Sequence, residues 1–175
     1  IELLEPIRSD TGVARYLESK GEVLHHICFR TDDIQAELTR LQANGVELID
    51  ESPRNGIAGE IAFIHPKAMH GVLIELAQPP SDSHAGSKKG FDHLAAMVTD
   101  IDSAAKDWAE VLGLNMSAKI DASDQGILIG QIPCGKAIME LVQPASGDSP
   151  LAAQLENVGE HPASMIAIEV PDLEG

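Results

Sequence analysis

Three short segments of this chain repeat one pattern, and this repeat limits the fold more than any other feature. The segments are IELLEP at 1–6, IELAQP at 74–79 and MELVQP at 139–144. Each contains a glutamate inside an apolar run, and a proline follows that glutamate four residues later. Repetition of this kind is typical of folds assembled from copies of one supersecondary unit.

A second pattern accompanies the first. Its copies are LHHICFRTDDIQA (24–36), FDHLAAMVTDIDSA (91–104) and SMIAIEVPDLEG (164–175). Each is a short apolar run that ends at an aspartate and an aliphatic residue, which predicts a strand followed by the start of a helix. His26 and His93 occupy equivalent places in the first two copies, and Met165 stands there in the third.

The apolar spacing predicts a helix after each of the first two runs. Residues 33–44 place apolar side chains at helical intervals before Gly45, and residues 102–112 repeat this design before Gly113. The predicted strands are 46–50, 60–65, 71–77, about 115–120, 126–132 and 136–142. The order β-α-β-β-β therefore occurs twice, which predicts an α+β fold of paired βαβββ modules.

The helix starts carry predicted caps. Asp33 and Asp102 lie where a carboxylate accepts hydrogen bonds from free N–H groups and stabilises the helix dipole.

A longer period, 138 residues, relates 1–22 to 139–160. We therefore expect the chain to be part of a longer protein. The predicted division is 1–21 as the last strand and connecting helix of a first module, 22–80 as a complete module, 81–89 as a polar Ser/Gly/Lys linker, 90–145 as a second complete module, and 146–175 as the connecting helix and first strand of a further module.

Composition excludes several classes of function. The net charge of −16 comes without a basic patch, so we expect no nucleic-acid partner. No apolar stretch approaches the ~20 residues of a membrane span, and no basic n-region of a signal peptide is visible. We expect a cytoplasmic protein in which Cys28 and Cys134 are reduced, buried thiols.

The repeated glutamates suggest a metal site. In GVLIELA, strand alternation puts Glu75 on one face and Ile74 and Leu76 on the other. A carboxylate buried there costs several kcal/mol unless it has a partner. Each complete module pairs such a glutamate with a histidine, as His26 with Glu75 and His93 with Glu140. An ordinary core histidine and a solvent-facing glutamate remain the alternative.

These residues resemble the vicinal oxygen chelate superfamily, which includes glyoxalase I, bleomycin-resistance proteins and extradiol dioxygenases. Residues 1–79 resemble methylmalonyl-CoA epimerases in IELLEP, GVARYLESKGE, LHHICFRTDDI, GVELIDESPR and FIHPK…GVLIELAQP. Residues 90–145 resemble them more loosely, in FDHLAAMVTDID, WAEVLGL and DQG. The resemblance implies curved mixed sheets that enclose a cavity for one divalent ion, with Co, Mn, Zn, Ni or Mg as the candidates.

The family takes a histidine from each first strand and a Glu or Gln from each last strand. By resemblance, Glu2, His26 and Glu75 belong to one site whose fourth ligand lies upstream. His93 and Glu140 match a second site, where Met165 replaces the second histidine with a thioether, a poor ligand for a hard ion.

The pairing of the modules stays open. If the modules 22–80 and 90–145 pair directly, His26, Glu75, His93 and Glu140 come together. Pairing between two copies of the chain, in a homodimer, is the other alternative.

The implied activity is epimerisation of an acyl-CoA thioester such as methylmalonyl-CoA. The metal ion stabilises the enolate while carboxylates remove and return the α-proton. Glu75 is the implied ligand and base, and Asp124 of DQG lies near the place of an opposing base.

Lys67 of IHPKAMHG is the implied contact to a carboxylate or phosphate of coenzyme A, although 68–70 depart from the family pattern. His25 is expected on the other side of the sheet from His26.

Three other activities remain as alternatives. They are a glyoxalase I-type lactoylglutathione lyase, an extradiol dioxygenase, and a non-catalytic binding protein of the bleomycin-resistance type. The aromatic content of 3% disfavours the last two.

Overall fold

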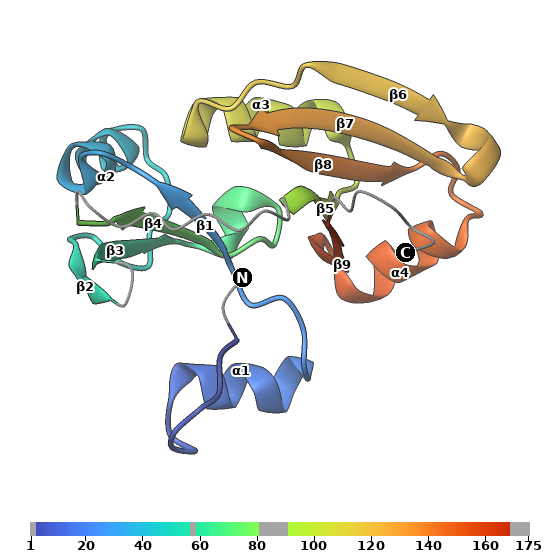
Figure 1. The fold of residues 1–175 in the computed structure, drawn as a ribbon. Coiled ribbons are helices and arrows are strands. Elements are labelled where there is room, and N and C mark those ends of the chain that lie inside the picture. The colour runs from blue at the N-terminus through green and yellow to red at the C-terminus, as the bar shows by residue number, and fades with distance from the viewer. Residues whose placement is uncertain (1–2, 57–58, 81–90, 169–175) are drawn as a thin grey trace, which may run out of the picture.

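The computed structural model describes residues 3–56, 59–80 and 91–168, which form two mixed sheets with helices packed against them (Figure 1). The N-terminal elements are α1 (Gly12–Lys20), β1 (Ile27–Arg30), α2 (Ile34–Ala43), β2 (Arg54–Gly56), β3 (Gly59–Ile64), the 3-10 turn η1 (Pro66–Met69) and β4 (Ile74–Gln78). The elements that follow are β5 (Phe91–Met97), α3 (Ile101–Leu112), β6 (Ala118–Ala122), the 3-10 turn η2 (Ser123–Gln125), β7 (Ile127–Cys134), β8 (Ala137–Pro144), α4 (Pro150–Val158) and β9 (His161–Ile168).

Four strands of each sheet share one topology. The first has the strand order β1-β4-β3-β2, and the second has the order β6-β7-β8-β5-β9. In each, the first strand of the module runs parallel to the last, as β1 with β4 and β5 with β8, while the other pairs are antiparallel. A parallel pair needs a crossover, and α2 and α3 supply it. The predicted α+β fold of two βαβββ modules is confirmed.

The two crossover helices begin at aspartate caps. Asp33 Oδ1 accepts a hydrogen bond from Ala36 N at 2.9 Å, as predicted. The prediction of Asp102 as the second cap is wrong, because Asp100 holds the extended backbone that precedes the helix and accepts from Ser103 N at 2.7 Å. Asp102 lies in the first turn of α3.

The predicted strand over 46–50 does not form. Among the described residues this segment makes only an isolated bridge between Leu48 and Ile64, and β2 lies further on. The Asp50 side chain accepts a hydrogen bond from Phe63 N at 3.0 Å. Phe63 belongs to β3, and its N–H would otherwise be available to pair β3 with a backbone carbonyl of 46–50. The Asp50 side chain therefore competes with strand pairing.

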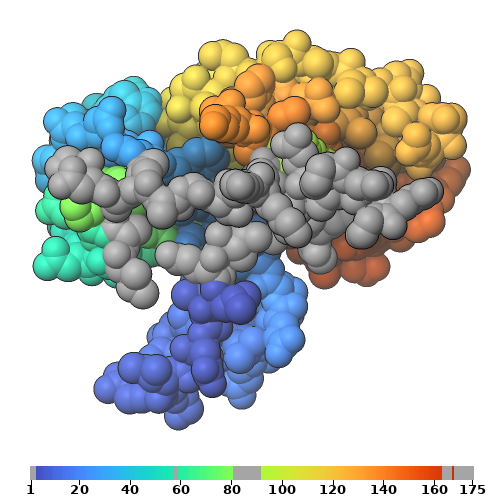
Figure 2. Space-filling view, viewed as in Figure 1, coloured from blue at the N-terminus to red at the C-terminus, as the bar shows by residue number. Residues whose placement is uncertain are grey.

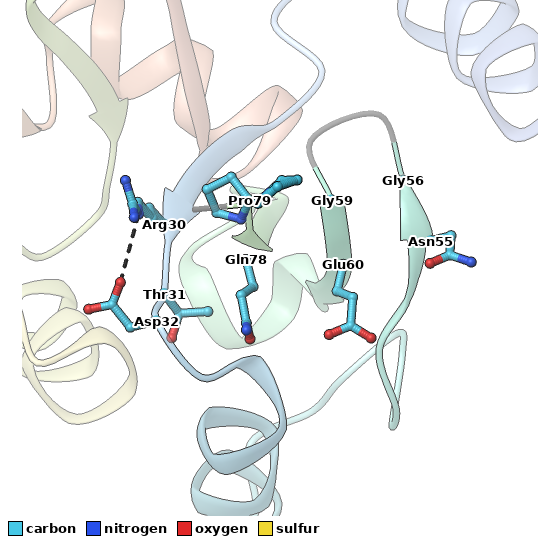
Figure 3. A pocket seen from close by; sticks show the side chains of 10 residues that line it. Arg30, Thr31, Asp32, Asn55, Gly56, Gly59, Glu60, Gln78 and Pro79 are labelled. Atoms are coloured by element: carbon cyan, nitrogen blue, oxygen red, sulfur yellow. Dashed lines mark ion pairs between the residues drawn. The ribbon is translucent and has the colours of Figure 1, made fainter. Parts of the chain in front are cut away.

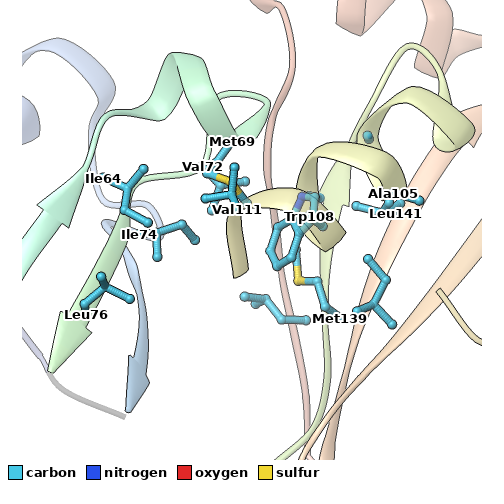
Figure 4. Packing of buried hydrophobic residues seen from close by; sticks show 14 of the residues in the cluster. Ile64, Met69, Val72, Ile74, Leu76, Ala105, Trp108, Val111, Met139 and Leu141 are labelled. Atoms are coloured by element: carbon cyan, nitrogen blue, oxygen red, sulfur yellow. The ribbon is translucent and has the colours of Figure 1, made fainter. Parts of the chain in front are cut away.

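One hydrophobic core joins the two modules. Ile74 and Leu76 of β4 and Met139 and Leu141 of β8 belong to the same cluster. Figure 4 shows Trp108 of α3 between the two groups, and its side chain is fully buried. The modules therefore pack through the helix-bearing faces of their sheets.

Helix α1 is different from the other helices, because none of its residues is buried. Figure 2 shows it projecting from the body formed by the two modules. Among the described residues, no helix combines the length and apolar character needed to cross a membrane. The prediction of two buried thiols is wrong for Cys28, which is exposed on β1, whereas Cys134 is half-buried.

Candidate metal centre

His26 and Glu75 meet on the sheet face opposite the shared core. His26 Nε2 lies 2.7 Å from Glu75 Oε2, and the side chains are 13% and 9% exposed. The parallel register of β1 and β4 pairs Cys28 with Glu75, which places the residue just before β1 next to the carboxylate. Glu75 is the buried charged residue of the described chain, so its carboxylate depends on polar partners for stability.

Two rings hold the His26 side chain. The ring of Phe63 contacts it edge-on, with the centroids 5.6 Å apart. His25 Nδ1 lies 3.0 Å from His26 Nδ1. Burial, followed by the charge of His26, lowers the pKa of His25. The expectation that His25 faces away from His26 is wrong, because β1 begins at Ile27 and strand alternation does not apply before it.

The second histidine–glutamate pair is looser. His93 Nε2 lies 3.8 Å from Glu140 Oε2, and the side chains are 27% and 15% exposed. Gln131 Nε2 donates to Glu140 Oε1 at 3.0 Å, so the carboxylate has a neutral partner. His93 Nδ1 lies 2.6 Å from Asp92 Oδ2.

The two pairs do not form one site. The core contains Ile74 and Met139, the strand neighbours of Glu75 and Glu140, so the two glutamates lie on faces turned away from the shared core. Among residues 3–56, 59–80 and 91–168, no group of three or more His, Cys, Asp or Glu side chains is close enough to hold a metal ion. The described structure therefore does not bring the four residues His26, Glu75, His93 and Glu140 together at one site. Glu2 lies outside the described residues, and the side chain of Met165 is not described.

Asp124 and Lys67 both lie on exposed 3-10 turns. Asp124 is exposed on η2, before β7 begins opposite Pro144. Glu140 lies opposite Gln131, four residues further along β7, or about 13 Å at the usual rise of a strand. Lys67 is exposed on η1, which packs against α3.

A separate cavity of about 700 Å³ opens at the carboxyl ends of β1 and β4 (Figure 3). Its walls are Arg30, Thr31, Asp32, Asn55, Gly56, Gly59, Glu60, Gln78, Pro79 and Pro80. Arg30 Nε lies 3.8 Å from Asp32 Oδ1, so the cavity wall carries a charge of each sign. Sequence reasoning missed the cavity, since no motif marks it.

Sequence reasoning also missed the Nδ1 contacts of both histidines. In each module the residue directly before the histidine makes that contact, as His25 for His26 and Asp92 for His93. The dipeptides HH and DH were the available signal.

Comparison with known proteins gives consistent family matches. Residues 1–64 and residues 90–175 each match a family model described as the Glyoxalase/Bleomycin resistance protein/Dioxygenase superfamily. The uncharacterized protein YqjC of Bacillus subtilis is 45% identical over 85 residues, which cover 48% of this chain and 61% of YqjC. The mitochondrial methylmalonyl-CoA epimerase of Dictyostelium discoideum is 39% identical over 80 residues, which cover 45% of this chain and 48% of the epimerase. The chain thus spans less than two thirds of these relatives.

Among solved structures, a variant of 4-hydroxymandelate synthase from Streptomyces coelicolor superposes with a TM-score of 0.68. The match covers 95% of this chain and 55% of the synthase, at 19% identity. It supports the arrangement of both modules, and at that identity it bears on the fold alone.

Proposed function

We propose that this chain, which belongs to the Glyoxalase/Bleomycin resistance protein/Dioxygenase superfamily, is the metal-binding part of an isomerase that acts on an acyl-CoA thioester. The epimerase named among its relatives supports methylmalonyl-CoA as the substrate to test first. The observation that carries the proposal is the buried contact between His26 and Glu75, 2.7 Å apart.

The donor atoms of this pair fit a divalent ion. A neutral imidazole nitrogen and a carboxylate oxygen suit Zn, Co, Ni and Mn, and the carboxylate also suits Mg. Glu75 is buried in contact with the His26 imidazole, and a metal ion bound there would neutralise the carboxylate charge. We propose Glu2 as a further ligand, because it occupies the position of Glu75 in the repeated segment IELLEP. His93 and Glu140 form a weaker candidate, because Gln131 already donates to Glu140.

The residues of the first pair have distinct proposed roles. When bound, the metal ion supplies positive charge that stabilises the enolate oxygen of the thioester. Glu75 takes the α-proton and returns it. Phe63 packs against His26 and restricts the orientation of its ring. Epimerisation also needs a group on the opposite face of the substrate, and we assign Asp124 no step because it lies on an exposed turn of the other module.

Metal content and proton exchange test this proposal. Elemental mass spectrometry of the purified chain should find about one divalent ion, lost in His26→Ala and Glu75→Gln and retained in the matched control His93→Ala. The metal-loaded chain should then exchange the α-proton of methylmalonyl-CoA for deuterium, and should leave the glutathione hemithioacetal of methylglyoxal unchanged. Failure to bind metal after addition of cobalt or manganese would refute the proposal, and turnover of the hemithioacetal alone would favour a glyoxalase-type lyase.

A further inference from the structure

We propose that Asp92 is a positioning residue for His93, and that it prepares the second pair, His93 with Glu140, to bind a divalent ion separately from the first pair. The inference rests on the metal chemistry of the proposed function, in which this pair is the weaker candidate. Its geometric basis is a set of contacts around the His93 ring. The Nδ1 atom lies 2.6 Å from Asp92 Oδ2, and the Nε2 atom lies 3.8 Å from Glu140 Oε2.

These two distances determine where the neutral His93 ring carries its hydrogen. An ionised carboxylate only accepts hydrogen bonds, so the hydrogen in the 2.6 Å contact belongs to His93 Nδ1. The 3.8 Å separation from Glu140 is too long for a hydrogen bond, so that carboxylate does not hold a hydrogen on Nε2. The lone pair of the neutral ring is therefore on Nε2, and a metal-binding imidazole needs a lone pair.

The first pair holds the opposite tautomer. Glu75 Oε2 lies 2.7 Å from His26 Nε2, which places the hydrogen on that nitrogen in the metal-free chain. An ion at the first pair has to displace this hydrogen, whereas the neutral His93 ring has none on Nε2. A carboxylate at the other ring nitrogen is the usual partner of a metal-binding histidine, and Asp92 supplies it in the second module.

Gln131 orients the carboxylate of the second pair. It lies opposite Glu140 in the register of β7 and β8, and its Nε2 atom donates to Glu140 Oε1 at 3.0 Å. Two ligands of one ion lie at most ~4.3 Å apart at usual metal–ligand distances, and the 3.8 Å from Glu140 Oε2 to His93 Nε2 is within this limit. In the part of the chain that the structure describes, no third His, Cys, Asp or Glu completes the group. We therefore expect weak binding that is seen only with added metal.

Substitutions at Asp92 test the inference in the His26→Ala chain, where the first pair is removed. Asp92→Leu removes the acceptor, and Asp92→Asn keeps an acceptor oxygen. The Asp92 side chain is 51% exposed, so both variants should fold. Loss of an outer partner typically weakens metal binding by about 10–100-fold, and we expect that loss in Co²⁺ titrations of Asp92→Leu. Asp92→Asn should lose less, and the matched control Asp102→Leu, which removes another exposed aspartate, should lose nothing. His93→Ala should abolish the binding.

Nitrogen NMR of the metal-free parent chain gives a readout that a packing role of Asp92 would not change. His93 should carry its hydrogen on Nδ1 in the parent and in Asp92→Asn, and should show a mixture of tautomers in Asp92→Leu. His26 is the internal reference and should be the same in all three. Identical His93 spectra in the parent and Asp92→Leu would overturn the inference, as would equal Co²⁺ affinity or no Co²⁺ binding in His26→Ala. If His26→Ala binds Co²⁺ as the parent does, the proposed function fails, and the Asp92 comparison still decides the inference.

Discussion

A Cβ atom added to Gly71 would lie 1.9 Å from the carbonyl oxygen of Glu160. Gly71 has a φ of +81°, and the preceding His70 also has a positive φ, of 51°. The His70 ring lies between two carboxylates, with Nδ1 2.6 Å from Glu160 Oε2 and Nε2 3.0 Å from Asp107 Oδ2. The turn after η1 therefore joins the first module to α3 and to the start of β9.

Gly71→Ala should destabilise the chain far more than Gly113→Ala. Both glycines have a positive φ, which costs an L-residue roughly 1–2 kcal/mol, but a Cβ at Gly113 meets nothing within 4 Å. The clash with Glu160 should add about 1–3 kcal/mol at Gly71. Urea unfolding measures the difference, and equal costs would show that the turn does not press against β9.

His70→Asn should lower the free energy of unfolding by about 1–3 kcal/mol, because hydrogen bonds to charged groups are lost. Asparagine tolerates a positive φ, so the backbone cost stays small. Lys106→Ala is the matched control on α3, since its pair with Glu110 is exposed and 3.8 Å long. That pair should contribute about 0.3–0.5 kcal/mol. Equal effects of the two variants in urea unfolding would argue against the His70 junction.

As the pH falls, the free energy of unfolding should decrease more steeply in the parent chain than in the Glu160→Gln variant. Burial raises the pKa of Glu160, but hydrogen bonds from Thr99 and His70 outweigh it and leave the pKa below its ordinary value of 4.5. A lowered carboxyl pKa adds stability above the ordinary pKa, and this stability is lost as pH falls through the lowered one. Unfolding midpoints from pH 6 to pH 3 test this, with Glu110→Gln as the exposed control. Parallel pH profiles for the parent and Glu160→Gln would contradict it.

Removal of His26 should cost more than removal of the whole His26–Glu75 pair. His26→Leu takes the imidazole from a buried carboxylate, and losing one partner of a buried pair typically costs about 3–5 kcal/mol. With Glu75→Leu added, the buried charge is gone and part of that stability should return. Urea unfolding in the presence of a chelator measures both variants. A double variant less stable than His26→Leu would mean that Glu75 has other dominant partners.

The local sequence pattern predicted the elements that depend on nearby residues. The apolar spacing of Ile34, Leu38 and Leu41 predicts α2, and all three side chains are buried. Alternation along β4 predicts that Ile74 and Leu76 face the core while Glu75 faces away. The repeat of strand, helix and three strands brings the first and last strands of a module together, so the meeting of His26 with Glu75 follows from order along the chain.

The repeated motif contained a second signal that sequence reasoning missed. The glutamine before the proline accepts a hydrogen bond from the first N–H of the crossover helix in both modules, as Gln78 with Ile34 N and Gln143 with Ile101 N, each at 2.8 Å. The ELxQP pattern therefore joins the last strand of a module to the start of its helix.

Only the tertiary structure decided how the two modules meet. Periodicity determines which face of a sheet is apolar, but an apolar face packs against any complementary surface, and its pattern does not name the partner. Here Trp108 fills the space between the helix-bearing faces, so Glu75 and Glu140 remain on separate surfaces. Likewise, the pairing of His70 with Asp107 and Glu160 joins residues 37 and 90 positions apart, a distance over which no local pattern operates.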